Sequence, residues 1–203
     1  MTLPGVERTT NLGPANYQAR VQSAARAGGL VYAVTFRQSP PHLIAYDPGS
    51  ERVVETHEIP MEGDADSPGA WNLVALDDRY LYTVLHEPTH LLRFDRETGA
   101  FDRLAEFPQT GEYLRCCRAI EPVGDTVVFA LKIDPVLYAW EHPDGGLRKF
   151  DRVHPTALKA IDLAATEDRV YAGGGTDAYL TGVDRSTGEM RDALPASLAE
   201  ETF

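Results

Sequence analysis

One repeated pattern constrains the fold of this chain more than any other feature of its sequence. Each copy begins with an apolar run centred on an aromatic residue, at Tyr32, Tyr82, Phe129 and Tyr171. A second apolar run follows and ends in an acid, at Asp47, Asp95, Glu141 and Asp184. The aromatic residues are 50, 47 and 42 residues apart, and the acids 48, 46 and 43. A period of this length is typical of repeat architectures.

Each acid opens a turn, and the four turns read "DPGSE", "DRETGA", "EHPDGG" and "DRSTGE". Glycine supplies the positive φ that such turns need, and we expect Asp47, Asp95 and Asp184 to accept hydrogen bonds from nearby backbone amides. One more short run precedes each aromatic anchor and a strand-like run follows each turn, so each repeat holds four short strands. This predicts an all-β fold, a β-propeller built of four-stranded antiparallel blades. About four blades are present, and they could be part of a larger propeller.

The repeat also divides the chain. We expect an N-terminal segment over 1–18, the propeller blades over 19–196 and a C-terminal lead-out over 197–203. The individual blades are expected at about 19–60, 66–108, 113–153 and 157–195.

The string His86-Glu87-Pro88-Thr89-His90 matches the H-E-x-x-H pattern of zinc proteases. That pattern carries chemistry only on a helix, where the two histidines share one face. Pro88 would break such a helix, and strand-like runs flank the string on both sides. We therefore expect a solvent-facing hairpin loop without a metal, although His86 and His90 could still meet across the hairpin, and the sequence leaves a metal there open.

Composition narrows the possible partners. The net charge of −12 makes nucleic acid and anionic membranes poor partners, because both would be repelled at long range. No apolar run approaches the length of a membrane helix, and the first residues lack the features of a signal peptide, so we expect a cytoplasmic protein.

The adjacent pair Cys116 and Cys117 is no disulfide framework, and we expect small buried side chains there rather than a nucleophile or a metal ligand.

The segments "FDRETGAFDRLAEFP" and "VDRSTGEMRDALP" resemble the outer hairpins of PQQ-like and YVTN (quinoprotein-type) β-propeller repeats. The resemblance covers about residues 19–195 and includes propeller domains of large bacterial proteins, some of them described as polysaccharide lyases. It implies the fold and leaves the activity open. The tryptophan docking motifs of PQQ dehydrogenases are not evident, since Trp71 and Trp140 lie in non-equivalent strands, so we expect no cofactor.

Propellers of the resembled type usually have six to eight blades, and this leaves three alternatives for a chain with four. The chain could close as a four-bladed disc. It could be an open half that forms a homodimer, or it could lack further C-terminal blades. The ending "LPASLAEETF" looks like the lead-in to another blade and favours the last two.

By analogy with other propellers, the first strand of each blade lines a central channel, and ligands bind at one mouth of it. We predict a ligand-binding site there from residues in the first-strand runs, namely Arg20, Trp71, Asn72, Arg115, Arg118 and Lys159. Asp162 is the one carboxylate among these runs. Converging positive groups would attract an anionic small molecule or an acidic saccharide such as a uronate. Alternatively, these residues pair with acids of neighbouring loops or point to solvent.

Two kinds of function remain. The first is a propeller that binds a ligand or a protein, with the basic channel mouth as its site. The second is a lyase or hydrolase acting on a uronate-containing polysaccharide, which needs a base such as His154, Tyr113 or His86 beside the basic residues.

The acids Glu62, Asp64 and Asp66 between the first two blades lack the pattern of a calcium loop, so we expect an acidic linker.

Overall fold

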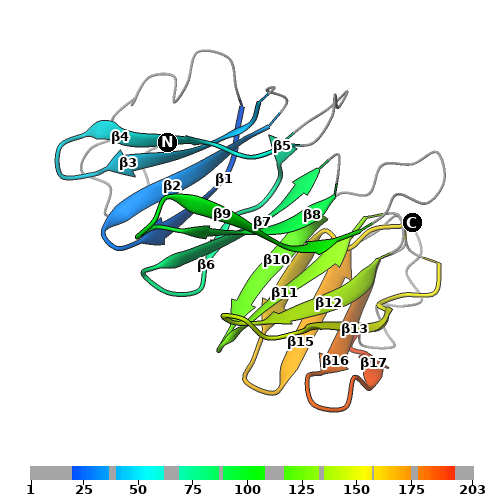
Figure 1. Cartoon of the computed structure of the whole chain (residues 1–203). Coiled ribbons are helices and arrows are strands. Elements are labelled where there is room, and N and C mark those ends of the chain that lie inside the picture. The colour runs from blue at the N-terminus through cyan, green and yellow to red at the C-terminus, as the bar shows by residue number, and fades with distance from the viewer. Residues whose placement is uncertain are drawn as a thin grey trace, which may run out of the picture.

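The computed structural model describes residues 20–36, 40–61, 69–86, 89–107, 117–132, 135–156, 158–174 and 178–194, and every regular element in these ranges is a β-strand. The strands form antiparallel sheets in the manner of propeller blades, which we number 1 to 4 along the chain (Figure 1). The all-β, propeller-type fold predicted from the repeat is therefore confirmed. None of the described residues belongs to a helix capable of spanning a membrane.

The strands of the first two blades pair in one continuous sheet. Blade 1 contains β1 (Arg20–Ala27), β2 (Leu30–Phe36), β3 (His42–Asp47) and β4 (Arg52–Glu58). Blade 2 contains β5 (Gly69–Ala70), β6 (Val74–Ala75), β7 (Tyr80–His86), β8 (His90–Asp95) and β9 (Ala100–Glu106).

The strands of the last two blades form separate four-stranded sheets, each in simple sequential order. Blade 3 contains β10 (Cys117–Val123), β11 (Thr126–Leu131), β12 (Val136–Glu141) and β13 (Leu147–Arg152). Blade 4 contains β14 (Asp162–Ala165), β15 (Arg169–Gly174), β16 (Tyr179–Asp184) and β17 (Met190–Asp192).

The inner strand of blade 2 is split into two pieces, β5 and β6. In β5, Gly69 pairs with Phe36 of blade 1 and also with His86 of blade 2, so β5 joins the two blades. Gly69 has a φ of 149°, a conformation open mainly to glycine. The break between β5 and β6 leaves Trp71, Asn72 and Leu73 outside the strand ladder, next to the inner strands of the neighbouring blades.

The turn acids behave as predicted from the sequence. Asp184 Oδ1 accepts hydrogen bonds from the backbone amides of Ser186 and Thr187, at 3.0 and 2.9 Å. Asp47 and Asp95 make the same kind of bond to the amides two residues ahead, both within 2.9 Å. These bonds favour the ionised acid and hold the pKa of the Asp184 carboxyl well below its usual range.

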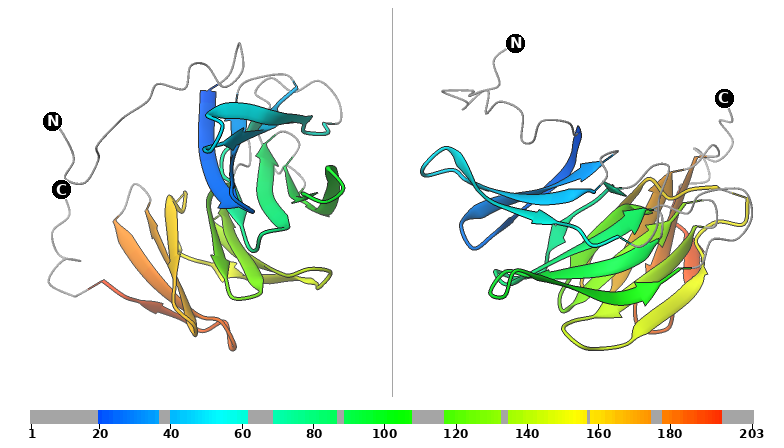
Figure 2. Two further views of the ribbon diagram at one scale, coloured as in Figure 1. Left: turned by 90° about the vertical axis from the view of Figure 1, so that its left-hand side faces the viewer. Right: turned by 45° about the horizontal axis from the view of Figure 1, so that its top comes forward.

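The hydrophobic core lies between the blades rather than inside any one of them. Side chains alternate faces along a strand, so each blade has one face toward the preceding blade and one toward the next. Tyr32 and Val34 pack against blade 2, Tyr82 and Val84 pack against blade 3, and Val128 and Ala130 pack against blade 4. Figure 2 shows the four blades stacked along an arc, with blades 1 and 4 at its two ends.

The sequence alignment on the aromatic anchors is wrong by one residue in the third blade. The register pairs Tyr32 with Ala45, Tyr82 with Arg93 and Tyr171 with Gly182, each partner two residues before a turn acid. In blade 3 the corresponding partner, Ala139, pairs with Val128, not with Phe129. Phe129 therefore faces the preceding blade, where it stacks on Tyr138 in the core between blades 2 and 3.

The H-E-x-x-H string lies at a β-hairpin, as its context predicted. His86 ends β7 and His90 begins β8, while Glu87 and Pro88 fall outside the described residues. The expectation that the string faces solvent is wrong, since His86 and His90 are only 5% and 2% exposed. No group of three or more potential metal ligands occurs in the part of the chain that the structure describes.

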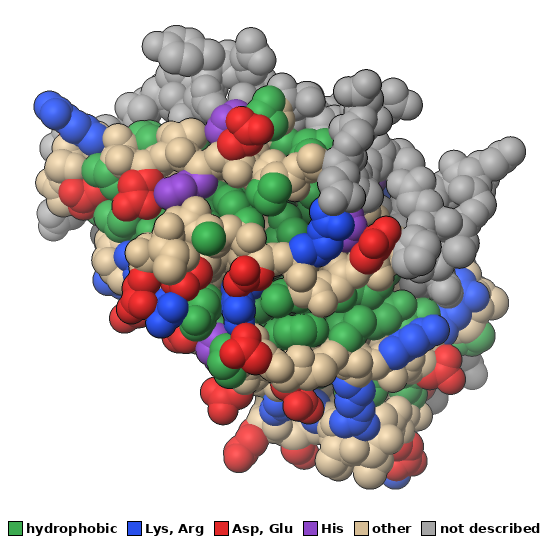
Figure 3. Space-filling view, viewed as in Figure 1, with side chains coloured by type: hydrophobic (Ala, Val, Ile, Leu, Met, Phe, Trp, Pro, Cys, Tyr) green, Lys and Arg blue, Asp and Glu red, His purple; other side chains and the backbone are tan. Residues whose placement is uncertain are grey.

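The charged surface is mixed in sign. On the face drawn in Figure 3, Lys and Arg side chains lie among Asp and Glu side chains. Part of this mixing is explained by ion pairs on blade 2, where Arg79 bonds Asp95 at 2.7 Å and Arg93 bonds Asp102 at 2.9 Å. These pairs neutralise part of the acidic charge of blade 2.

Candidate functional site

Three of the six residues predicted to bind a ligand come together. Trp71 and Asn72 lie between β5 and β6 of blade 2, and Arg118 lies on β10 of blade 3. The guanidinium carbon of Arg118 is 4.6 Å from the centroid of the Trp71 ring, a cation–π contact between neighbouring blades. We call this pair the Trp71–Arg118 stack.

Aromatic side chains extend this contact toward blade 1. The Phe36 ring lies 4.4 Å from the Trp71 ring, and the buried His86 ring meets Trp71 edge-on at 6.5 Å. Arg20 is the register partner of Phe36, so its side chain leaves the sheet on the same face as Phe36. Arg20 is exposed and lies on the face of blade 1 that carries Phe36.

Asn72 holds the blades together with its own polar groups. The side-chain Nδ2 of Asn72 donates to the backbone carbonyl of Cys117 at 3.1 Å, and the backbone carbonyl of Asn72 accepts a 2.5 Å hydrogen bond from Thr83 Oγ1. The next amide, of Leu73, donates to Ser23 Oγ on blade 1 at 3.1 Å. These bonds keep the break in the inner strand of blade 2 in one conformation, which positions Trp71.

Two N–H donors in the stack are buried without an acceptor. They are Trp71 Nε1 and Arg118 Nε, and neither has a hydrogen-bond partner among the described residues. A buried donor without an acceptor costs about 1–3 kcal/mol, and such groups are rare in folded proteins. An oxygen acceptor that reached these two donors would therefore be stabilised.

The remaining predicted residues lie elsewhere. Lys159 is half-buried before β14, and its carbonyl accepts a 3.0 Å bond from the Tyr179 hydroxyl. Arg115 lies outside the described residues, as do Cys116, Tyr113 and the acids between blades 1 and 2. Cys117 is 1% exposed in the core between blades 2 and 3, as expected of a small buried side chain.

The inner strands carry both signs of charge rather than being uniformly basic. Glu121 on β10 and Asp162 on β14 are close enough to interact, and burial together with the Asp162 charge raises the pKa of Glu121. Glu121 was not among the residues predicted from the first-strand runs. The signal that could have revealed it is the length of the strand, since β10 extends past Ile120 through Pro122 to Val123.

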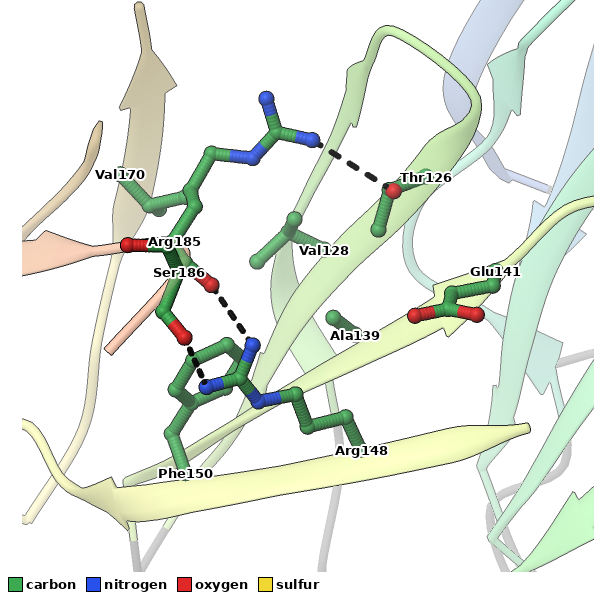
Figure 4. A pocket seen from close by; sticks show the side chains of 9 residues that line it. All are labelled: Thr126, Val128, Ala139, Glu141, Arg148, Phe150, Val170, Arg185 and Ser186. Atoms are coloured by element: carbon green, nitrogen blue, oxygen red, sulfur yellow. Dashed lines mark hydrogen bonds between the residues drawn. The ribbon is translucent and has the colours of Figure 1, made fainter. Parts of the chain in front are cut away.

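A second feature, absent from the sequence predictions, is a pocket of about 240 Å³ between blades 3 and 4 (Figure 4). We call it the inter-blade pocket. Its floor is formed by the buried residues Val128, Ala139 and Val170, with Phe150 at the side. Arg148 lies across it, with its guanidinium carbon 4.5 Å from the centroid of the Phe150 ring.

Two arginines shape the pocket. Arg148 donates to the carbonyls of Arg185 and Ser186 at 2.7 and 2.9 Å, which fixes its guanidinium against blade 4. Arg185 reaches the other way and donates to the Val123 carbonyl of blade 3 at 3.1 Å. Glu141 lines the mouth and is exposed. The pocket thus combines an apolar floor with cationic walls.

No protein-family model matches the sequence. No curated protein matches it either.

Several solved structures are similar in fold. The computationally designed Ika4 protein is 14% identical, with a TM-score of 0.64 over 87% of this chain and 99% of that one. The designed Ika8 protein is 15% identical, with a TM-score of 0.63 over 86% of this chain but only 48% of its own. The extracellular domain of a putative hybrid two-component system, BT4673 of B. thetaiotaomicron, is 14% identical, with a TM-score of 0.64 over 90% of this chain and 23% of its own. At these identities the likeness shows the fold alone.

Proposed function

We propose that this chain is a propeller-type binding module whose ligand site is the Trp71–Arg118 stack. The observation that supports this most directly is the pair of buried donors without acceptors, Trp71 Nε1 and Arg118 Nε. Both are N–H groups, so the complementary ligand group is an oxygen acceptor. The Arg118 guanidinium charge, with Arg20 on the same face of blade 1 as Phe36, favours a carboxylate, which accepts charge-assisted bonds. The ligand class is an anionic small molecule or an acidic saccharide.

The test is titration calorimetry with trigalacturonate and with citrate. Arg118→Ala should weaken binding of the preferred anion by about tenfold or more, because a hydrogen bond to a charged group contributes about 1.5–3 kcal/mol. Arg52→Ala removes the same charge from an exposed position on β4 and should leave the affinity unchanged. Equal affinities of the two variants, or no binding of either anion by the unaltered chain, would contradict the proposal.

A second variant separates stacking from hydrogen bonding. Trp71→Phe keeps an aromatic ring beneath Arg118 but removes the Nε1 donor. If the ligand accepts a bond from this donor, Trp71→Phe weakens binding while the cation–π contact persists.

The alternative, a lyase or hydrolase acting on a uronate polysaccharide, is supported by one observation. Of the three bases considered, His86 lies beside Trp71, whereas His154 stacks on Tyr179 between blades 3 and 4. His86 is 5% exposed, which limits its access to a substrate. Binding without release of unsaturated or reducing sugar ends would favour the binding module over the enzyme.

We also propose that the repeat belongs to the PQQ-like and YVTN class, with the outer hairpins "FDRETGAFDRLAEFP" and "VDRSTGEMRDALP" as its support. Those two segments form the turns between β8 and β9 and between β16 and β17, and in both turns the acid binds backbone amides.

A second copy of this chain is the partner we propose for the open ends of the arc. Tyr171 of blade 4 occupies the register position that in blades 1 and 2 contacts the next blade, and it is only half-buried. At the other end, Val21 and Val53 of blade 1 are each 45% exposed. The chain covers 48% of the designed Ika8 chain, so two copies together have about the length of that chain.

A further inference from the structure

The inter-blade pocket lies at a repeat position that two other blades fill with tyrosine. In each of blades 1 to 3, one residue of the second strand pairs with the residue that lies two positions before the turn acid, and its side chain faces the next blade. This residue is Tyr32 in blade 1, Tyr82 in blade 2 and Val128 in blade 3. Val128 lies on the floor of the pocket. The pocket therefore occupies the place where the shorter side chain leaves room between the blades.

In the two filled interfaces, the residue after the turn acid of the next blade binds the tyrosine hydroxyl. Arg96 Nε donates to the Tyr32 hydroxyl at 2.8 Å, with the guanidinium carbon 5.3 Å from the ring centroid. His142 Nδ1 and the Tyr82 hydroxyl are 2.5 Å apart. Each interface thus contains an aromatic ring with an oxygen and a nitrogen group that recognises that oxygen.

The third interface keeps the donor and lacks the ring. Arg185 follows the turn acid Asp184 and reaches blade 3, as Arg96 reaches blade 1. Its Nη1 donates to the Glu167 carbonyl at 2.5 Å, and its Nη2 donates to the Val123 carbonyl at 3.1 Å. Among the described residues Arg185 Nε has no acceptor, although the same atom of Arg96 binds the Tyr32 hydroxyl.

Size and charge agree with a small aromatic occupant. A cavity of about 150 Å³ lined by apolar side chains is enough to bind benzene. The inter-blade pocket is larger, at about 240 Å³, and is lined by Val128, Ala139, Val170 and the Phe150 ring. Two cations, Arg148 and Arg185, and one anion, Glu141, line the pocket, and the Arg185 guanidinium points toward Thr126 (Figure 4). The two cations favour a ligand oxygen at the end of the ring.

The geometry points to the inter-blade pocket as a second binding site, for a small para-substituted phenol that takes the place of the absent tyrosine side chain. The ring packs on Val128 and Ala139, and the phenolic oxygen accepts a hydrogen bond from Arg185 Nε. This site is separate from the Trp71–Arg118 stack and does not depend on the function proposed for it.

The experiment is thermal unfolding of the whole chain with para-cresol, compared with toluene, which has the same ring and methyl group but no hydroxyl. At ten times its Kd, para-cresol should raise Tm by about 3–6 °C, because a ligand that binds only the folded state stabilises it by mass action. Toluene should act more weakly, and methyl NMR signals of Val128 and Val170 should shift with para-cresol. No shift in Tm or in these signals overturns the proposal.

Two substitutions test the pose. Val128→Tyr supplies the tyrosine covalently, so this variant should unfold about 2–6 °C higher than the unaltered chain and should no longer respond to para-cresol. An equal response of both proteins overturns the assignment. Arg185→Lys keeps the positive charge but removes Nε, so it should reduce the response to para-cresol to that of toluene even if Val128→Tyr fails to fold. An unchanged preference for para-cresol in Arg185→Lys also overturns it.

Discussion

Glu121 and Asp162 lie on neighbouring inner strands, where their negative charges repel each other. Burial of Glu121 is the main cause of its raised pKa, and repulsion by Asp162 adds to it. A carboxyl with a raised pKa in the folded protein destabilises the fold when it is ionised. Stability therefore falls as the pH rises from the pKa of the unfolded chain through the higher pKa of the folded protein.

We predict that Glu121→Gln raises Tm at pH 7, because glutamine has a similar shape and carries no charge. The gain should shrink as the pH is lowered toward 4, where Glu121 itself becomes protonated and neutral. Unfolding followed by circular dichroism between pH 4 and pH 8 measures this. The matched control is Glu58→Gln, an exposed carboxylate at the end of β4. A gain that is the same for both variants at every pH would refute the role of burial.

At the scale of elements, the residue after the turn acid in blades 2, 3 and 4 connects each of these blades to the one before it. Arg96, His142 and Arg185 contact the preceding blade through Tyr32, Tyr82 and the Val123 carbonyl, respectively. In blade 1 this position is Pro48, which has no side-chain donor. Gly28 shows how closely the arginine approaches, since a Cβ at this residue would collide with the Arg96 guanidinium.

A double-mutant cycle between Arg96 and Tyr32 measures the coupling energy of their hydrogen bond between blades 1 and 2. Arg96→Ala and Tyr32→Phe each remove one partner of the hydrogen bond, so their effects on the free energy of unfolding should not add. We expect a coupling energy of about 1–2 kcal/mol, typical of a hydrogen bond to a charged group that is partly exposed. The cycle of Arg52→Ala with Tyr32→Phe is the control and should be additive. A coupling near zero would mean that Arg96 contributes only packing.

At the scale of the whole molecule, the two ends of the arc present faces that the inner blades bury. If a second copy covers them, blade 4 of each copy packs on blade 1 of the other, and the twofold symmetry closes the ring without leaving an edge. Exposed sheet faces and edges otherwise favour aggregation.

Light scattering after size exclusion should give a mass of about 45 kDa, twice the 22.3 kDa of one chain. Tyr171→Asp places a charge at the centre of the proposed contact and should give a 22.3 kDa monomer with an unchanged circular dichroism spectrum. If the unaltered chain is a stable monomer, or if Tyr171→Asp remains a dimer, the ring of two copies is excluded.

The sequence by itself determined the features that depend on local chemistry. Turns need glycine and an acid within a few residues, and strands show themselves as short apolar runs, so the repeat predicts the blades and the bonds of Asp47, Asp95 and Asp184. The same local reasoning brought Trp71, Asn72 and Arg118 into one set, because each lies in an inner run.

Only the tertiary structure decided how these residues meet across blades. A one-residue change of register moves a side chain to the opposite face, so Phe129 could be aligned with Tyr82 in sequence and still face the other way. The same register leaves Val128 at the position of the pocket. The break between β5 and β6 places Trp71 under Arg118, and the full length of β10 brings Glu121 toward Asp162. Contacts of this kind depend on strand pairing and blade packing between residues far apart in the chain, which a local pattern does not encode.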